Sequence, residues 1–168
     1  MNVGKEIGLL AKKQNVCIDF YKKMLKQTDI SSLCRMYFEG SDWATENDFP
    51  DLETLRKFRG NSDRYGLHTD YVGEMSLENL KNQRAFFGNS DVDIYAGGFS
   101  VSEVYIRHNS KARIKANGSA FMVVNIYDSA SVQIECEEDA MVSVFYYGEE
   151  NSVKYSGNVK ITKKSWAK

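Results

Sequence analysis

The chain has 168 residues, enough for one domain or for one domain with an appended subdomain. Hydrophobic residues make up 42% of it, which is usual for a globular protein. Its 22 basic and 23 acidic residues leave a net charge of −1. Because nucleic-acid-binding proteins normally carry a basic excess, we expect no nucleic-acid partner.

The sequence contains no apolar run near the roughly 18 residues that a membrane-spanning helix needs. Its first residues, MNVGKEIGLLAKKQ, are too polar for the core of a signal peptide. Cys17, Cys34 and Cys136 have no C-x-x-C spacing, and we expect them to be reduced core thiols. These features predict a cytoplasmic protein without a membrane partner.

Helical spacing of apolar residues predicts four short helices in the first part of the chain. They fall within residues 7–11, 18–25, 33–38 and 52–58. Ser31 or Ser32 is the expected N-cap of the third helix. Asp48 and Pro50 are expected to open the fourth helix, and Gly60 to end it.

An acidic stretch, EGSDWATENDFP, lies between the third and fourth helices. Its carboxylates are Glu39, Asp42, Glu46 and Asp48. This density of acidic residues could bind a cation, but the spacing is not that of an EF-hand. Helix capping and solvation explain the carboxylates more simply, and Trp43 is expected to be a packing anchor.

The segment before the repeat is less regular. Residues 61–75 are predicted to be a loop with one short strand. Residues 76–84 fit either a helix or a first strand. The strand interpretation follows from extending the repeat backwards, which places Leu80 and Phe86 in core positions.

A ten-residue repeat runs without a gap from residue 88 to residue 147. One of its columns is entirely aliphatic: Ile94, Val104, Ile114, Val124, Ile134 and Val144. Turn-forming residues such as Gly88, Gly98 and Gly118 lie at the joins. Because side chains alternate faces along a strand and ten is even, every copy keeps the same side inward. Equal, ungapped copies favour a solenoid over a meander or a sandwich.

Ten residues are too few for a full coil, so each coil is expected to contain two copies. Small inward residues alternate with large ones from copy to copy: Ala96, Ala116 and Cys136 against Ile106, Ile126 and Tyr146. Small side chains from one sheet facing large ones from the other would fill a thin core. We therefore predict about three coils of about 20 residues, built from two sheets.

The predicted fold class is α+β. A helical N-terminal subdomain, residues 1–75, should pack on a short two-sheet β-solenoid (a single-stranded β-helix), residues 76–168. The solenoid should be regular over residues 88–147. Residues 148–168 should form a capping coil, because an exposed terminal edge would pair with other molecules.

The two sheets differ in their outward residues. The first has a polar face whose charges alternate in sign between neighbouring coils, and its candidate ligand-binding residues are Asp93, Tyr95, Lys111, Arg113 and Lys115. The second is largely apolar outside, and its candidate interface is Val101, Tyr105, Phe121, Val123, Met141 and Phe145. An apolar face of this extent is rarely left in water, so we expect the N-terminal helices or another protein to cover it.

The motifs of common enzymes are missing from the sequence. It contains no G-x-G-x-x-G, no P-loop and no G-x-S-x-G nucleophile elbow. His108 occupies a turn position of the repeat. His68 lies beside Asp70, but without a nucleophile motif this pair does not predict acyl transfer. We expect no cofactor, no metal and no catalytic residues, and we lean towards a protein that is not an enzyme.

Three segments carry a resemblance: ENDFP at 46–50, VYIRHNSKARI at 104–114 and GNVKI at 157–161. They resemble a group of small hypothetical proteins of gut bacteria and their mobile elements. In that group a helical segment precedes a short β-solenoid. The resemblance implies this fold and no activity.

Three functions remain open. The first is a non-enzymatic protein-interaction or scaffold module, with a protein partner or a second copy on the apolar sheet. The second is a carbohydrate-binding or carbohydrate-active solenoid that uses the wet sheet. The third is a structural protein that self-assembles through an imperfectly capped end.

Overall fold

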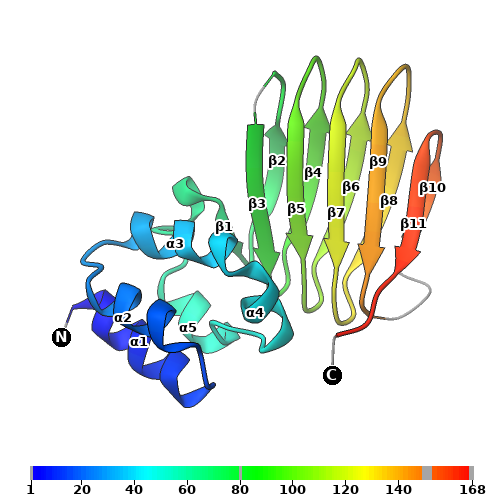
Figure 1. Cartoon of the computed structure of the whole chain (residues 1–168). Coiled ribbons are helices and arrows are strands. Elements are labelled where there is room, and N and C mark those ends of the chain that lie inside the picture. Colours follow the sequence, from blue (N-terminus) through cyan, green and yellow to red (C-terminus); the bar gives the residue numbers. More distant parts are fainter. Residues whose placement is uncertain (1, 80, 149–152, 167–168) are drawn as a thin grey trace. The chain divides into compact units, whose positions relative to one another are not determined.

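A computed structural model describes residues 2–79, 81–148 and 153–166. The chain divides into two compact units, Met1–Leu67 and His68–Lys168. The first unit is helical and the second is a parallel two-sheet β-solenoid (Figure 1), so the predicted α+β class is confirmed. The expected division at residues 75 and 76 falls inside a strand, β2 (Val72–Ser76).

The helical unit contains the four predicted helices and one more. They are α1 (Val3–Lys13), α2 (Ile18–Leu25), α3 (Ile30–Glu39), α4 (Ser41–Glu46) and α5 (Leu52–Lys57). The acidic stretch did not predict α4, because six residues are too few to show a helical period. Ala44 and Thr45 are buried on its inner side. Trp43 packs on Phe49 with ring centroids 5.0 Å apart, as a packing anchor should.

Two of the predicted caps are wrong. Helix α3 begins at Ile30, and the Asp29 carboxylate accepts the Ser32 N–H at 2.8 Å. Helix α5 is capped by Asp51, whose carboxylate accepts the Thr54 N–H at 2.8 Å. In both cases an aspartate just before the helix satisfies an N–H of the first turn that no helical carbonyl can reach.

Gly4 lets α1 approach α2 closely. A Cβ at this position would lie 2.1 Å from the carbonyl oxygen of Gln27 and 2.4 Å from that of Met24. Both atoms are backbone, so the helices would have to part. Gly8 has more room, since its Cβ would meet the flexible Leu25 side chain at 3.2 Å.

We expect Gly4→Ala to lower the free energy of unfolding by about 1–3 kcal/mol, despite the better helix propensity of alanine. Gly8→Ala is the matched control, because it brings the same gain in propensity with a contact that can relax. Urea unfolding of both variants measures the difference. Equal stability of the two variants would contradict the close approach at Gly4.

The solenoid is longer than predicted. The six-stranded sheet runs in the order β1 (Leu67–Thr69), β3 (Lys81–Phe87), β5 (Val101–Ile106), β7 (Phe121–Ile126), β9 (Met141–Tyr146) and β11 (Val159–Lys163). The five-stranded sheet runs in the order β10 (Val153–Ser156), β8 (Ser131–Cys136), β6 (Lys111–Ala116), β4 (Asp91–Ala96) and β2. A short 3-10 helix, Asp63–Tyr65, precedes β1. The three regular coils are confirmed, and one irregular coil on each side brings the total to about five.

The register explains why the outer coils were harder to predict. In the regular part Asp91 pairs with Lys111, an offset of 20 residues. At the first coil Val72 pairs with Asp91, an offset of 19, and at the last Val142 pairs with Val159, an offset of 17. Within the ambiguous segment 76–84, residues 81–84 belong to β3, so the strand interpretation is confirmed for that part. Phe86 is in the core as expected, while Leu80 and parts of the predicted cap, 149–152 and 167–168, lie outside the described residues.

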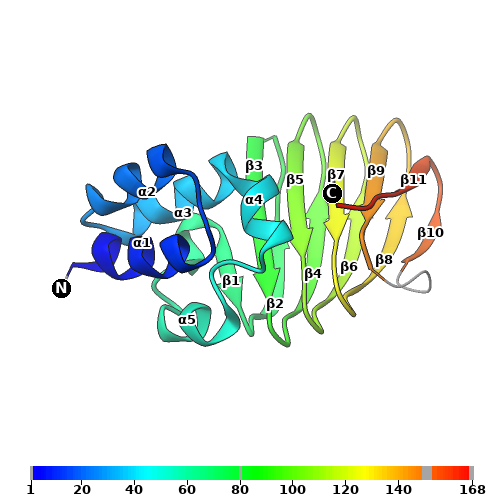
Figure 2. The same ribbon diagram turned by 60° about the horizontal axis from the view of Figure 1, so that its bottom comes forward.

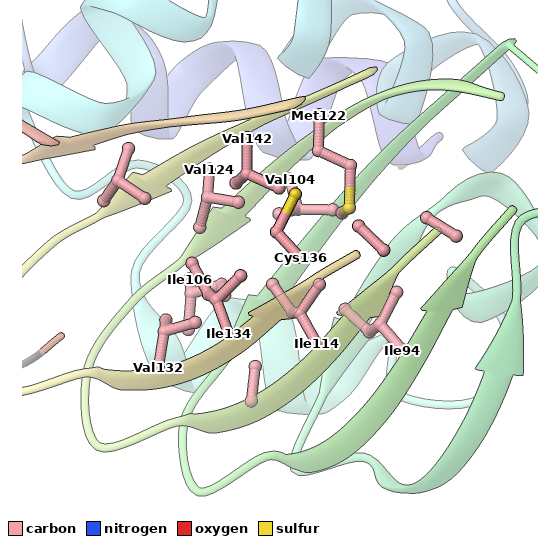
Figure 3. Close-up of a cluster of buried hydrophobic side chains, with 14 of the residues drawn as sticks. Ile94, Val104, Ile106, Ile114, Met122, Val124, Val132, Ile134, Cys136 and Val142 are labelled. Carbon is pink, nitrogen blue, oxygen red and sulfur yellow. The ribbon is translucent and has the colours of Figure 1, made fainter. Parts of the chain in front are cut away.

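The residues predicted to point inward form the core of the solenoid. Ile94, Ile114 and Ile134 on one sheet are at most 1% exposed, and so are Val104, Val124 and Val144 on the other. Figure 3 shows the side chains of Ile94, Ile114 and Ile134 and those of Val104 and Val124 pointing into the space between the two sheets. The small residues Ala96, Ala116 and Cys136 are buried in the same cluster as Ile106 and Ile126.

The turns repeat a left-handed backbone position every ten residues. It is occupied by Gly88, Gly98, His108, Gly118, Asp128 and Glu138, all with φ between 54° and 71°. His108 is a turn residue, as expected, and its Nδ1 accepts the Gly88 N–H of the preceding coil at 3.0 Å. Asp128 in turn accepts the His108 N–H at 3.1 Å. The turn side chains therefore tie successive coils together.

Glu138 destabilises the fold at this position, because its Cβ crowds the backbone when φ is 55°. We expect Glu138→Gly to raise the free energy of unfolding by about 0.5–1 kcal/mol. Gly118→Ala, in the same column, should lower it, since φ is 61° and a Cβ would lie 3.0 Å from the Gly98 nitrogen. Thermal unfolding checks both, and a destabilised Glu138→Gly protein would contradict the strain.

Candidate functional site

An exposed apolar row lies on the outward face of the six-stranded sheet. It consists of Val101, Phe121 and Met141, which are in register on β5, β7 and β9. Their exposed fractions are 46%, 39% and 51%. Phe99, in the turn before β5, is 79% exposed. Since parallel strands lie about 4.8 Å apart, the row forms a contiguous apolar strip along the coils.

The other predicted interface residues on this face are covered to a greater degree. Tyr105 is 5% exposed, and its hydroxyl donates to the Glu103 carboxylate at 2.6 Å. Val123 and Phe145 are half-buried. Asn125, between Tyr105 and Phe145 in the register, is buried and donates to the same carboxylate at 3.3 Å. Among the described residues of β5, β7 and β9, the most exposed apolar side chains on this face therefore lie at the start of each strand.

The C-terminal segment covers the other end of this face. Trp166 stacks on Tyr147 with centroids 4.5 Å apart, and Tyr147 stacks on Tyr127 at 4.8 Å. Arg107 lies over the Tyr127 ring at 5.0 Å. Figure 2 shows the segment running back from β11 toward the end of β7. Arg107, Tyr127 and Tyr147 follow the 20-residue spacing, but the repeat did not predict Trp166, which lies outside it.

The polar face of the five-stranded sheet pairs its charges internally. Arg113 donates to Asp93 at 2.5 Å and to Asp91 at 2.7 Å. These two hydrogen bonds raise the pKa of Arg113 further above its usual range. Lys115 lies 3.7 Å from Glu135 on the next strand. The alternation of charge seen in the sequence therefore becomes a set of ion pairs between coils.

The remaining candidate ligand-binding residues of this face are exposed. Tyr95 is 40% exposed and Lys111 is also exposed. Both stand beside the cluster of Arg113 with Asp91 and Asp93, whose charges are paired with one another. The arrangement is that of a solvated sheet surface more than of a preorganised anion or sugar site.

The acidic stretch does not gather its carboxylates. Glu39 pairs with Lys23 on α2, while Asp42, Glu46 and Asp48 are exposed. Within residues 2–79, 81–148 and 153–166, no three metal-binding side chains come together.

His68 lies in the core of the first coil. Its ring stacks on Phe86 with centroids 5.0 Å apart and meets Tyr71 edge-on at 5.0 Å. Burial, assisted by the positive charge of Arg84, lowers the pKa of His68 to about 4. The neighbouring Asp70 uses its carboxylate to accept the Asn89 N–H at 2.8 Å. His68 is therefore a packed aromatic ring without access for a substrate.

One cysteine is placed differently from the prediction. Cys34 and Cys136 are buried thiols, but Cys17 is exposed at the start of α2. It lies at the N-cap position, outside the apolar face of either neighbouring helix. Burial raises the pKa of Cys34 to about 12 and that of Cys136 above its usual value. The two core thiols are therefore poor nucleophiles.

A small cavity lies inside the helical unit. Its volume is about 70 Å³, and its walls are mostly apolar, with Phe20, Met24 and Leu33 among them. An apolar cavity that holds benzene has about 150 Å³. The cavity is thus a gap in packing more than a ligand site.

No helix within the described residues is both long and apolar enough to cross a membrane. Comparison with protein-family models, with curated proteins and with solved structures found no match. The resemblance to small solenoid proteins of gut bacteria therefore stays a prediction.

Proposed function

We propose that the protein is an interaction module that presents the outward face of its six-stranded sheet to a protein partner. The observation that carries this proposal is the exposed apolar row, in which Val101, Phe121 and Met141 are neighbours in register. Contiguous apolar side chains that stay in water typically mark a binding surface. A partner that buries them would gain the free energy of removing their area from water.

The scaffold suits such a role because it holds the row in place. Each residue of the row belongs to a six-residue strand with a strand on either side in the described sheet. The side chain two residues further along β7, Val123, is half-buried and apolar, and extends the strip toward the middle of the face. A preorganised surface loses little conformational entropy on binding. The paired charges of the polar face favour the apolar face as the contact.

A capture experiment tests the proposal. Phe121→Asp places a charge in the centre of the row, and Lys111→Asp places one on the polar face as the matched control. We expect partner protein captured from native lysate by the wild type and by Lys111→Asp, and a loss of about tenfold or more with Phe121→Asp. Equal capture by both variants, or capture lost only with Lys111→Asp, would overturn the proposal. Circular dichroism verifies that both variants keep the fold.

A further inference from the structure

The last coil leaves the end of the solenoid core incompletely covered. Val159 and Ile161 align with fully buried valines of β9, yet both are only half-buried. Tyr155 aligns with Ile134, which is 1% exposed, but Tyr155 itself is 53% exposed. Among the described residues, therefore, this end of the core presents apolar side chains that the regular coils bury.

Strand β11 is also the edge of the six-stranded sheet as described. Lys164 donates its N–H to β9 at 2.9 Å, and the Asn158 carbonyl accepts an N–H from β9 at 3.1 Å. In a parallel sheet, the backbone N–H and C=O groups of every second residue bond to the strand on one side. The groups of the residues between them point to the other side. The carbonyls of Val159 and Ile161 and the N–H of Ile161 consequently point toward the open edge, while the Val159 N–H donates to the Gly157 carbonyl at 3.0 Å.

The described residues of this coil carry charges of one sign, and Glu149 and Glu150 precede them in the sequence. Residues 153–166 contain four lysines and no aspartate or glutamate. Lys160, on β11, and Lys154, on β10, are exposed. Lysines on an edge strand discourage pairing with a like strand, because two copies would bring like charges face to face. The same lysines favour a strand that carries carboxylates.

We propose that the β11 edge accepts an extended acidic segment of a partner polypeptide as an added strand. Its apolar side chains would cover Val159 and Ile161 and so complete the core. Its carboxylates, on alternate positions, would face Lys160 and the outward side of the sheet. Main-chain hydrogen bonds to the open edge would supply affinity, and the alternation of side chains would supply selectivity.

Two labelled nonapeptides test this surface by fluorescence polarisation, one alternating glutamate with valine and one alternating lysine with valine. We expect the wild-type protein to bind the glutamate peptide at least about tenfold more tightly than the lysine peptide. Lys160→Glu should abolish this preference or reverse it. Lys111→Glu makes the same change of charge on the polar face and should leave binding unchanged.

A second variant tests the backbone contact. Ile161→Pro removes an N–H from the open edge and leaves the bonds to β9 in place, so it should abolish peptide binding while the circular dichroism spectrum stays native. Absence of binding to the wild type, or equal binding of both peptides, would overturn the proposal. So would a wild-type dimer in sedimentation velocity that Ile161→Pro dissociates, because the edge would then belong to a second copy.

Discussion

An alanine inserted between Val123 and Val124 is expected to remove the cooperative unfolding transition of the solenoid. A shift of one residue turns the rest of β7 over, so that Val124 and Ile126, both 0% exposed, would face water. Burial of each side chain contributes about 1.5–3 kcal/mol, so the pair represents about 3–6 kcal/mol. This is a large part of the stability of a typical domain, about 5–15 kcal/mol. Urea unfolding followed by circular dichroism measures the effect.

The matched control is the same insertion between Glu138 and Asp139. Both residues are exposed in the turn between β8 and β9, where an extra residue leaves the inward sets of the strands unchanged. We expect this protein to keep a cooperative transition at lower stability. If the insertion in β7 cost no more than the insertion in the turn, the register of the solenoid would be wrong.

Between pH 7 and pH 5 the protein is expected to lose about 2 kcal/mol of stability through His68 alone. Burial lowers the folded-state pKa of His68 to about 4, below its ordinary value of 6.5. The unfolded chain therefore binds a proton first as the pH falls, and stability is lost from about pH 6.5 down to about pH 4. Above pH 6.5 the contribution is fully present, because the ring is neutral in both states.

His68→Phe tests this pH dependence. Phenylalanine keeps an aromatic ring against Phe86 and cannot titrate. The variant should lose most of the stability change between pH 7 and pH 5 in urea unfolding. A wild-type protein with equal stability at both pH values, or a variant with the same slope as the wild type, would show that His68 can be protonated in the folded state.

The regular coils were predictable because one physical rule acts six times in succession. Each ten-residue copy keeps its inward and outward positions, and every join except the one at Glu138 carries a residue that tolerates a left-handed backbone. The column from Ile94 to Val144 therefore predicted the inward set and the two sheets together. No tertiary information was needed, since every strand meets an equivalent of itself 20 residues away.

The first coil was ambiguous because polar residues occupy its inward positions. Arg84 aligns with the buried Val104, and Asn82 aligns with Ser102. Arg84 is half-buried and donates to the Gln83 carbonyl at 2.9 Å, and burial lowers its pKa. An apolar alternation is therefore weakest where the core ends. Polar residues at inward positions mark a terminal coil. The regular coils have mostly apolar residues at these positions, so their pattern does not predict such a coil.

The sequence could predict which face carries the candidate interface, but not which of its residues are exposed. The alternation of side chains along the strands placed Tyr105 and Phe121 on the same outward face. It could not predict that Tyr105 is buried and Phe121 exposed. That distinction depends on what covers the far ends of the strands. Segments outside the repeat also contact this face, as where Trp166 stacks on Tyr127 with ring centroids 5.7 Å apart. Contacts between distant, non-repeated segments carry no periodic signal.

The two proposed surfaces differ in chemistry. The exposed apolar row contains three large side chains without charge and lies on the face of the sheet. The β11 edge combines open peptide groups with lysines and lies at the end of the coil stack. One partner could occupy either surface without the other, so variants at Phe121 and at Lys160 should have independent effects.

Site-specific photo-crosslinking tests the central claim most directly. A photoreactive phenylalanine analogue replaces Phe121 in one protein and Lys115, which is exposed on the polar face, in another. We predict a discrete crosslinked product with a second protein in native lysate from position 121 and none from position 115. Crosslinking of equal yield at both positions, or at position 115 alone, would contradict an interaction through the exposed apolar row.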